Sequence, residues 1–428
     1  MVTRMNEPPP PEVDTTSDAP SEAHGRFAAL SSPAFRLLMS AGMVMQLGGW
    51  IQRVALSWVV YELTGSAVAL GGLQFLTNIS VIVLSPMAGI AADRFGARRV
   101  LMLASIGQAA AAGVLAQAVY TEHASLGLLY AVGATFGVGH ALNQPTRNLL
   151  VYDSVGRDRL RNGLALNALT GGWMRIIGPS MGGVLIAVGG GAGLAFGLQA
   201  VLLAIAVVLV WLLPIETTRS TVTEHPLSAL RGGMRHFREN ALVRRSVIIS
   251  ALTAGFVYPY LGFIPVFAVK SFNGGSWEQG ILFSAGGVGS MIGLWYVMAG
   301  RGGMRSMLWT GTAYMTLVIA FTQSSHFWLG FGLLVAAGAV HSVFSTLNQA
   351  LVQLNAREEF RARIMGIYSM VGGIEPFSAL LLGVLIDSVG IAKATGSYVT
   401  FAMLVTLAFA ISATIRERRG PEVAPDRT

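Results

Sequence analysis

Residues 89–99 read GIAADRFGARR, a short basic loop that holds one acid, Asp93, between two long apolar segments. Those segments cover residues 70–92 and 100–120. Because Gly96 can adopt the positive φ of a tight turn and arginines surround it, the stretch is typical of a short loop between two membrane-spanning helices. The sequence therefore predicts an integral membrane protein with this loop on the cytoplasmic side.

The composition agrees with that class. Hydrophobic residues make up 53% of the 428 residues and charged residues only 12%, whereas a soluble domain carries about 25% charge. At about 20 residues per span there is room for about a dozen helices. We expect spans at 35–61, 66–92, 99–120, 124–149, 161–188, 191–213, 243–271, 277–299, 304–322, 326–352, 362–388 and 392–415.

The net charge of +8 follows the expected topology. Of the 29 lysines and arginines, 25 precede the first span, occupy every second loop or follow the last span, while Lys270 and Lys393 lie on the other side. The positive-inside rule then places both termini in the cytoplasm of a multi-pass protein of the bacterial inner membrane. The basic charge therefore reflects topology, and we expect no nucleic-acid partner.

Two halves are indicated by a long connection and by an internal repeat. We expect a disordered tail over 1–34, six helices over 35–213, a cytoplasmic linker over 214–242, six helices over 243–415 and a tail over 416–428. Residues 227–238 of the linker resemble a surface amphipathic helix. The triplet Leu-Asn-Gln at 142–144 recurs at 347–349, and Gly-Val-Leu-Ile at 183–186 recurs at 383–386. Parallel repeats of this kind are a common transporter architecture.

Polar residues at helical spacing mark the first, fourth and tenth spans, and more weakly the seventh. Polar groups within a bilayer must face protein or water, so these four helices are expected to line a central cavity. The candidate substrate-binding residues on them are Gln46, Arg53, His140, Asn143, Gln144, Tyr258, His341, Ser345 and Asn348.

With these features in place, the chain resembles the major facilitator superfamily over all twelve spans. Residues 89–99 are similar to its Gly-x-x-x-Asp-Arg-x-Gly-x-Arg-Arg loop signature. Within the superfamily the chain resembles the secretion-effector branch, which contains the enterobactin exporter and macrolide efflux pumps. That resemblance is carried by residues 50–53, 58–66, 143–147, 167–169, 175–183 and 363–369.

The resemblance implies a cytoplasmic gate in the loop between the second and third spans. Asp93 would face the inner end of the eleventh helix, where free N–H groups favour an anion, and Gly89 would allow the second and eleventh helices to pack closely. The arginines would pair across the gate, or would merely set the topology. The gate residues are Gly89, Asp93, Arg94, Gly96, Arg98 and Arg99.

A glycine motif in the fifth span resembles the latter part of the antiporter signature of drug exporters. Its helix-packing residues are Gly178, Pro179, Gly182 and Gly183. Met174 and Asn167 stand where the upstream glycines of that signature fall. The fourth span also lacks the arginine that drug antiporters carry before a Gly-x-Gly pattern, which argues against coupling in the manner of those pumps.

Three charged residues lie well inside expected spans, where each costs roughly 2.5–3.5 kcal/mol on insertion scales. Aligning the repeats makes Arg175 and Glu375 pseudo-symmetry mates. We expect Glu375, with Arg175, to couple transport to protons, the alternative being a static ion pair or a carboxyl bonded to backbone. Arg53 would bind an acidic substrate, or would be structural. By contrast, Glu62 and Asp387 are expected to be solvated at the outer ends.

Several chemistries are not supported by the sequence. The chain has no cysteine and no Gly-x-x-x-x-Gly-Lys-Ser/Thr phosphate loop, so thiol chemistry and ATP-driven transport within this chain are excluded. We expect no metal, cofactor or enzyme activity. The sequence predicts a monomeric, proton-coupled exporter of a small amphiphilic or acidic molecule, working by alternating access. The alternatives are an uptake symporter or facilitator, and a membrane sensor or scaffold.

Overall fold

A computed structural model describes residues 27–214, 240–299, 303–356, 364–365 and 367–418, which are helical almost throughout. The first half comprises η2 (Ala28–Ser31), α1 (Pro33–Thr64), α2 (Ala67–Phe95), α3 (Ala97–Tyr120), α4 (Leu126–Leu185), η3 (Ile186–Gly190) and α5 (Gly191–Trp211). The second half comprises α7 (Ala241–Phe256), η4 (Tyr258–Phe263), α8 (Ile264–Val266), η5 (Phe267–Ser271), α9 (Ser276–Ala299), α10 (Met304–Thr322), α11 (Phe327–Asn355), η6 (Val371–Ile374), α13 (Glu375–Val389) and α14 (Ile391–Arg418).

Helix ends follow local sequence signals. Ser66 and Ser125 precede α2 and α4, and their hydroxyls accept hydrogen bonds from the backbone N–H groups three residues on. Such serine caps satisfy N–H groups that have no partner within the helix. Gly65 ends α1 with a φ of 62°, and Gly96 ends α2 with a φ of 86°, the left-handed region that glycine enters without strain.

Each of the twelve expected spans corresponds to a helical segment. Helix α4 holds the fourth and fifth spans, divided at Gly156, where φ is 70° and ψ is 178°. Length and apolar composition alone select seven membrane-spanning segments in the described part of the chain. The other expected spans are helical but are not selected by these two criteria.

Two spans of the second half are discontinuous. The seventh span changes from α7 to a 3₁₀ turn at Tyr258 and ends in a π-helical turn. Pro259 and Pro265 remove backbone donors there, which explains the break. In the eleventh span the 3₁₀ turn η6 precedes α13, whose second residue is Pro376. Broken helices of this kind expose backbone groups near the bilayer midplane in many transporters.

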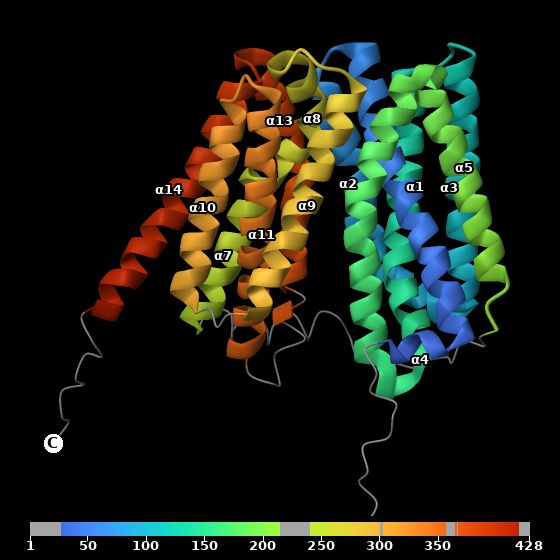
Figure 1. Ribbon diagram of the computed structural model, residues 1–428, viewed down its shortest axis with the longest axis horizontal. Coiled ribbons are helices and arrows are strands. Elements are labelled where there is room, and N and C mark those ends of the chain that lie inside the picture. The colour runs from blue at the N-terminus through green and yellow to red at the C-terminus, as the bar shows by residue number, and fades with distance from the viewer. Residues whose placement is uncertain (1–26, 215–239, 300–302, 357–363, 366, 419–428) are drawn as a thin grey trace, which may run out of the picture.

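Two helical bundles stand side by side, as Figure 1 shows. They meet along two pairs of helices, α2 with α13 and α4 with α9. Helix α1 begins and α14 ends at the same end of the molecule (Figure 1), here named the terminus end, and the opposite end is named the distal end. The expected linker helix at 227–238, and most of both tails, lie outside the described residues.

Glycines let the two halves touch backbone to backbone toward the distal end. A Cβ atom added to Gly183 of α4 would lie 2.5 Å from the Ser276 carbonyl oxygen, and one on Gly383 of α13 would lie 2.7 Å from the Ala67 carbonyl oxygen. A side chain at either position would therefore force the halves apart. Small residues allow the same close approach between helices in many membrane proteins.

The buried apolar side chains show which end is open. One large cluster spans both halves and includes Ile51 and Phe196 of the first half and Phe263 and Phe321 of the second. Toward the terminus end, the core of the first half, which includes Leu101, is separate from two clusters of the second half. The described halves are therefore joined toward the distal end and separated at the terminus end.

Candidate functional site

The second half contributes a tyrosine–histidine pair at the break in the seventh span. The Tyr258 hydroxyl lies 2.9 Å from Nε2 of His341 on α11, and the two rings meet edge to face at 5.4 Å. Tyr314 of α10 packs on the same imidazole at 4.9 Å between ring centroids. Because the break places Tyr258 at the start of a 3₁₀ turn, its side chain reaches across to α11.

Glu375 occupies the second break. It is the first residue of α13, directly after η6, and its side chain is half-buried. Gly372 and Gly373 belong to the 3₁₀ turn before it. A carboxylate in the first turn of a helix is stabilised by the free N–H groups and the helix dipole, so the break provides a favourable place for this charge within the membrane.

The first half contributes two arginines that share one tryptophan. The guanidinium carbon of Arg53 lies 5.0 Å from the ring centroid of Trp50, and that of Arg175 lies 5.9 Å from it. Both arginine side chains are exposed although each lies deep within its span. Stacking on an aromatic face holds a guanidinium in place and leaves its N–H donors free for another partner.

Charges connect these groups across the two halves. Glu375 interacts electrostatically with Arg53, while Arg175 interacts with Tyr258 and His341. Both Arg175 and Glu375 interact electrostatically with Tyr258. The expected role of Glu375 and Arg175 in proton coupling stays a prediction. Arg53, Arg175, Tyr258, His341 and Glu375 are named the central cluster below.

A further arginine lies in the first half, nearer the terminus end. Arg147 of α4 is 7% exposed, and one of its terminal nitrogens donates to Oδ1 of Asn167 at 2.5 Å, while its Nε has no partner. It fills the space above Gly42, where an added Cβ would lie 2.5 Å from the guanidinium. Arg147 is among the 25 basic residues that the charge pattern assigns to the cytoplasmic side, and its place two helical turns after His140 is the signal that marks it as a residue within the fourth span.

His140 is a second basic residue of α4, two helical turns before Arg147. Its ring is exposed and interacts with the charges of both Arg53 and Arg147. Along α1 and α4, basic groups thus run from the terminus end to the central cluster.

Two asparagines expected in the cavity bind within their own halves instead. Asn348 is 1% exposed and donates to the Ser250 hydroxyl at 2.6 Å, joining α11 to α7. Asn143 donates to Oε1 of Gln108 at 3.0 Å, joining α4 to α3. Both lie at the same place in the internal repeat, and both serve packing because a neighbouring helix supplies a polar partner.

For the other three expected cavity residues, Gln46, Gln144 and Ser345, the structure shows no hydrogen bond to the opposite half among the described residues. The amide oxygen of Gln46 lies against Gly171 of α4, where an added Cβ would be 2.9 Å away. Gln144 is exposed. The Ser345 hydroxyl donates to the Ser342 carbonyl of its own helix at 3.2 Å.

The expected gate loop is open. No atom lies within 4 Å of a Cβ placed on Gly89, so the close packing expected there is found at Gly383 instead. Asp93 and Arg99 are exposed, and the guanidinium of Arg94 lies 5.4 Å from the Phe95 ring. These residues do not bridge the halves in the described part of the chain, because the halves are separated at this end.

Arg98 does not pair across the gate as the resemblance implied, because it binds within its own half. Its guanidinium donates to the carbonyl oxygens of Val210, at 3.0 Å, and of Trp211. These carbonyls belong to the last turn of α5 in the same half, where a helix leaves its carbonyl oxygens without the usual partners; the Val210 carbonyl also accepts from the Leu213 N–H at 3.2 Å. Arg98 therefore caps a neighbouring helix, which also satisfies the negative end of its dipole.

The glycine motif in the fifth span packs against both halves. A Cβ on Gly178 would lie 2.5 Å from Cβ of Trp50, and one on Gly182 would lie 3.2 Å from Cα of Ile51. On the other side, a Cβ on Gly280 of α9 would lie 2.6 Å from the Pro179 carbonyl oxygen. The motif thus positions Trp50 and lets α4 approach α9.

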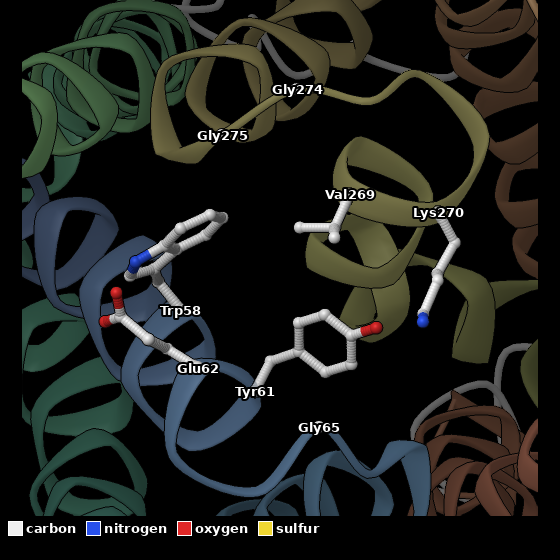
Figure 2. A pocket seen from close by; sticks show the side chains of 8 residues that line it. All are labelled: Trp58, Tyr61, Glu62, Gly65, Val269, Lys270, Gly274 and Gly275. Atoms are coloured by element: carbon white, nitrogen blue, oxygen red, sulfur yellow. The ribbon is translucent and has the colours of Figure 1, made fainter.

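A seal and a pocket follow the central cluster along α1. Nε2 of Gln279 donates to the Val54 carbonyl at 3.1 Å and to the Ser57 hydroxyl at 2.9 Å, and all of these atoms are buried. Beyond this seal lies a distal pocket of about 530 Å³. Figure 2 shows its lining residues, Trp58, Tyr61, Glu62, Gly65, Val269, Lys270, Gly274 and Gly275.

Asp387 at the distal end corrects a second expectation. Its carboxylate is not merely solvated, since it accepts hydrogen bonds from the Ser66 hydroxyl and from the N–H groups of Ala67 and Val68. No pattern in the sequence brings the end of α13 to the start of α2.

Among the described residues, no group of three histidine, aspartate or glutamate side chains is arranged to hold a metal ion.

The comparisons with known proteins identify the family. The model of the transmembrane secretion effector family matches residues 24–426. The chain belongs to this family. It is a major facilitator transporter rather than an enzyme. The resemblance found in the loop at 89–99 is thereby confirmed.

Several characterised relatives share the length of the chain. The staphyloferrin A transporter of Staphylococcus aureus is 23% identical over 382 residues, which is 87% of this chain and 95% of that protein. The enterobactin exporter EntS of Escherichia coli is 26% identical over 413 residues, or 92% and 95%. The multidrug efflux pump Tap of Mycolicibacterium fortuitum is 24% identical over 373 residues, or 83% and 90%.

Solved structures agree on the fold. The nucleoside transporter NupG aligns with a TM-score of 0.70 at 15% identity, covering 88% of this chain and 99% of that one. A bacterial homologue of the lysosomal transporter Spinster, in an inward-facing and unoccupied conformation, aligns with a TM-score of 0.65 at 13% identity, covering 89% and 95%. The transporter therefore has the twelve-helix major facilitator fold.

Proposed function

We propose that this transporter exports a small acidic or amphiphilic molecule in exchange for protons. The observation that carries the proposal is the central cluster, in which exposed Arg53 of one half interacts electrostatically with Glu375 of the other. A transporter whose two halves rock around a midplane site needs groups from both halves at that site. The names of the staphyloferrin A and enterobactin relatives support a siderophore-like substrate, and that of Tap supports a drug-like one.

The proposed orientation places the terminus end in the cytoplasm. Arg36, Arg99 and Arg161 belong to the terminus end, whereas Lys270 and Lys393 belong to the distal end. The positive-inside rule favours this arrangement in an inner membrane. The conformation described above then opens toward the cytoplasm, where an exporter must collect its substrate.

The chemistry of exchange follows from the attraction between Arg53 and Glu375. A proton on Glu375 removes the carboxylate charge, and an anionic substrate on Arg53 satisfies the guanidinium. Either event weakens the attraction between the halves, so each ligand permits a change of conformation by itself. The substrate then leaves in one direction and the proton returns in the other. Arg175 and the Tyr258–His341 pair supply further donors and acceptors for the substrate.

Replacing Glu375 by glutamine tests the coupling. The glutamine keeps the shape of the side chain but binds no proton, so Glu375→Gln is expected to abolish accumulation driven by a proton gradient in everted vesicles. Binding of the probe substrates enterobactin and staphyloferrin A should persist. Glu62→Gln, which removes a carboxylate from the distal pocket, is the matched control and should transport normally. Undiminished uphill transport by Glu375→Gln would overturn the proposal.

A further inference from the structure

The distal ends of the two halves are joined by one carboxylate. Asp387, two residues before the end of α13, accepts hydrogen bonds from the Ser66 hydroxyl at 2.7 Å, the Ala67 N–H at 2.8 Å and the Val68 N–H at 3.1 Å. All three donors lie at the start of α2, which belongs to the other half. The side chain is otherwise exposed.

These hydrogen bonds meet a requirement of α2. The first N–H groups of a helix have no acceptor within the helix, and the positive end of its dipole lies beside them. Ser66 caps α2 from within the chain but accepts only the Ala69 N–H. Asp387 takes the N–H groups of Ala67 and Val68, so two N–H groups of the first turn of α2 depend on an acid from the opposite half.

The surrounding packing makes this contact depend on conformation. One turn before Asp387, Gly383 touches the Ala67 carbonyl, where an added Cβ would lie only 2.7 Å away. The helices run antiparallel, so α2 begins where α13 ends. If the halves separate at the distal end, all three hydrogen bonds must break together, because donors and acceptor move with different halves.

At the opposite end of α2, the corresponding acid makes no hydrogen bond between the halves in the described part of the chain. Asp93 lies near the last turn of α2, as Asp387 lies near the last turn of α13. Asp93 is exposed, with no hydrogen bond or ion pair to any residue in the described ranges. At the end where the halves are joined the acid is engaged, and at the end where they are separated it is free.

We propose that Asp387 is the latch of the distal gate: it holds the halves together while the transporter is open at the terminus end and releases them when the distal end opens. This inference rests on the proposed function only in assuming that the halves alternate. The latch acts as a gating residue and touches no substrate, so its loss is expected to change the balance of conformations rather than the chemistry of the central cluster.

Distance measurements between spin labels on the full-length protein in lipid nanodiscs test the latch. The chain has no cysteine, so pairs of introduced cysteines label cleanly. The distal pair is Leu63→Cys with Val389→Cys and the terminus pair is Phe95→Cys with Leu354→Cys, all at exposed positions. The measurement needs neither substrate nor gradient, so its failure is distinct from a failure of proton-coupled export.

The expected result is a shift of the populations in Asp387→Asn. Loss of a capping carboxylate should raise the ratio of distal-open to distal-closed molecules about tenfold, lengthening distances in the distal pair and shortening them in the terminus pair. The matched control is Glu62→Gln, since Glu62 is an exposed distal acid without a hydrogen bond to any described residue. It should leave both distributions unchanged.

A double variant separates a latch from a simple helix cap. Ser66→Asp combined with Asp387→Asn supplies an acid that caps α2 from its own half. A latch between halves predicts that the double variant stays shifted toward the distal-open state. Restoration of the wild-type distances by Ser66→Asp would overturn the proposal, as would unchanged distances in a monodisperse, helical Asp387→Asn protein.

Discussion

The exposed side chain of Arg53 stacks on one aromatic ring and interacts electrostatically with an acid of the other half. Trp50 fixes one face of its guanidinium, while Glu375 attracts it from across the interface. A substrate anion that reaches Arg53 replaces the attraction of Glu375. Recognition of an acidic group and release of the halves are therefore expected to depend on the same side chain.

Substitution of Arg53 should weaken substrate binding in proportion to the donors lost. Arg53→Ala removes charge-assisted hydrogen bonds worth about 1.5–3 kcal/mol each, so the affinity for enterobactin or staphyloferrin A should fall at least about tenfold by calorimetry. Arg53→Lys keeps the charge without the planar fork and should be intermediate. Arg161→Ala, at an exposed position of the terminus end, serves as the control. Equal affinities for all four proteins would refute this role of Arg53.

Asn348 contributes to stability instead of binding. Its buried amide joins α11 to α7 through Ser250. Truncation removes this hydrogen bond between the helices and leaves the Ser250 hydroxyl only its bond to the Ser246 carbonyl. Asn348→Ala should lower the free energy of unfolding by about 1–3 kcal/mol, seen as a lower melting temperature in detergent. Gln349→Ala, at the exposed neighbouring position, should have little effect. If Asn348→Ala instead weakens substrate affinity without lowering the melting temperature, Asn348 belongs to the binding site.

At the scale of helices, the sequence located elements better than it located their contacts. Apolar length and glycine turns placed all twelve spans, because both are local properties of the chain. Polar periodicity predicts that Arg53, Tyr258 and His341 line the central cavity, and that assignment stays a prediction. The periodicity could not separate the centre of the molecule from a neighbour in the same half, and Asn143 and Asn348 were misplaced for that reason.

The internal sequence repeat did not predict which side chains from distant helices meet. Aligning the two halves makes Arg175 and Glu375 equivalent positions, whereas the arginine that interacts electrostatically with Glu375 is Arg53. The charge pattern assigns Arg147 to the cytoplasmic side, whereas α1 and α4 bury its side chain above Gly42. In the same way, Asp387 gained a role only when the end of α13 met the start of α2.

The contact of α4 with α9 should control closure of the distal end. Gly183→Val places a side chain where an added Cβ already lies 2.5 Å from the Ser276 carbonyl, so it should hold the distal end open. Labelling of Leu63→Cys by a membrane-impermeant maleimide should then become faster. Gly197→Val, where no atom lies within 4 Å of the added Cβ, should label at the wild-type rate. Identical rates in both variants would show that this contact does not set closure.

The whole molecule is a two-half transporter that closes at one end and opens at the other. The shared apolar core, the Gln279 seal and the Asp387 contact all lie toward the distal end, while the separate cores and the exposed gate loop lie at the terminus end. In between, the central cluster belongs to both halves. In the proposed alternating-access cycle, movement of the halves would change which side reaches Arg53 and Glu375.

The central claim is that substrate and protons are exchanged through this cluster. The most direct test uses everted membrane vesicles with an acidic interior, to which enterobactin or staphyloferrin A is added outside, the face proposed to be cytoplasmic. The account predicts a partial collapse of the proton gradient that requires the transporter and is lost in Glu375→Gln. Entry of the substrate into the vesicles with no change in the gradient would contradict it.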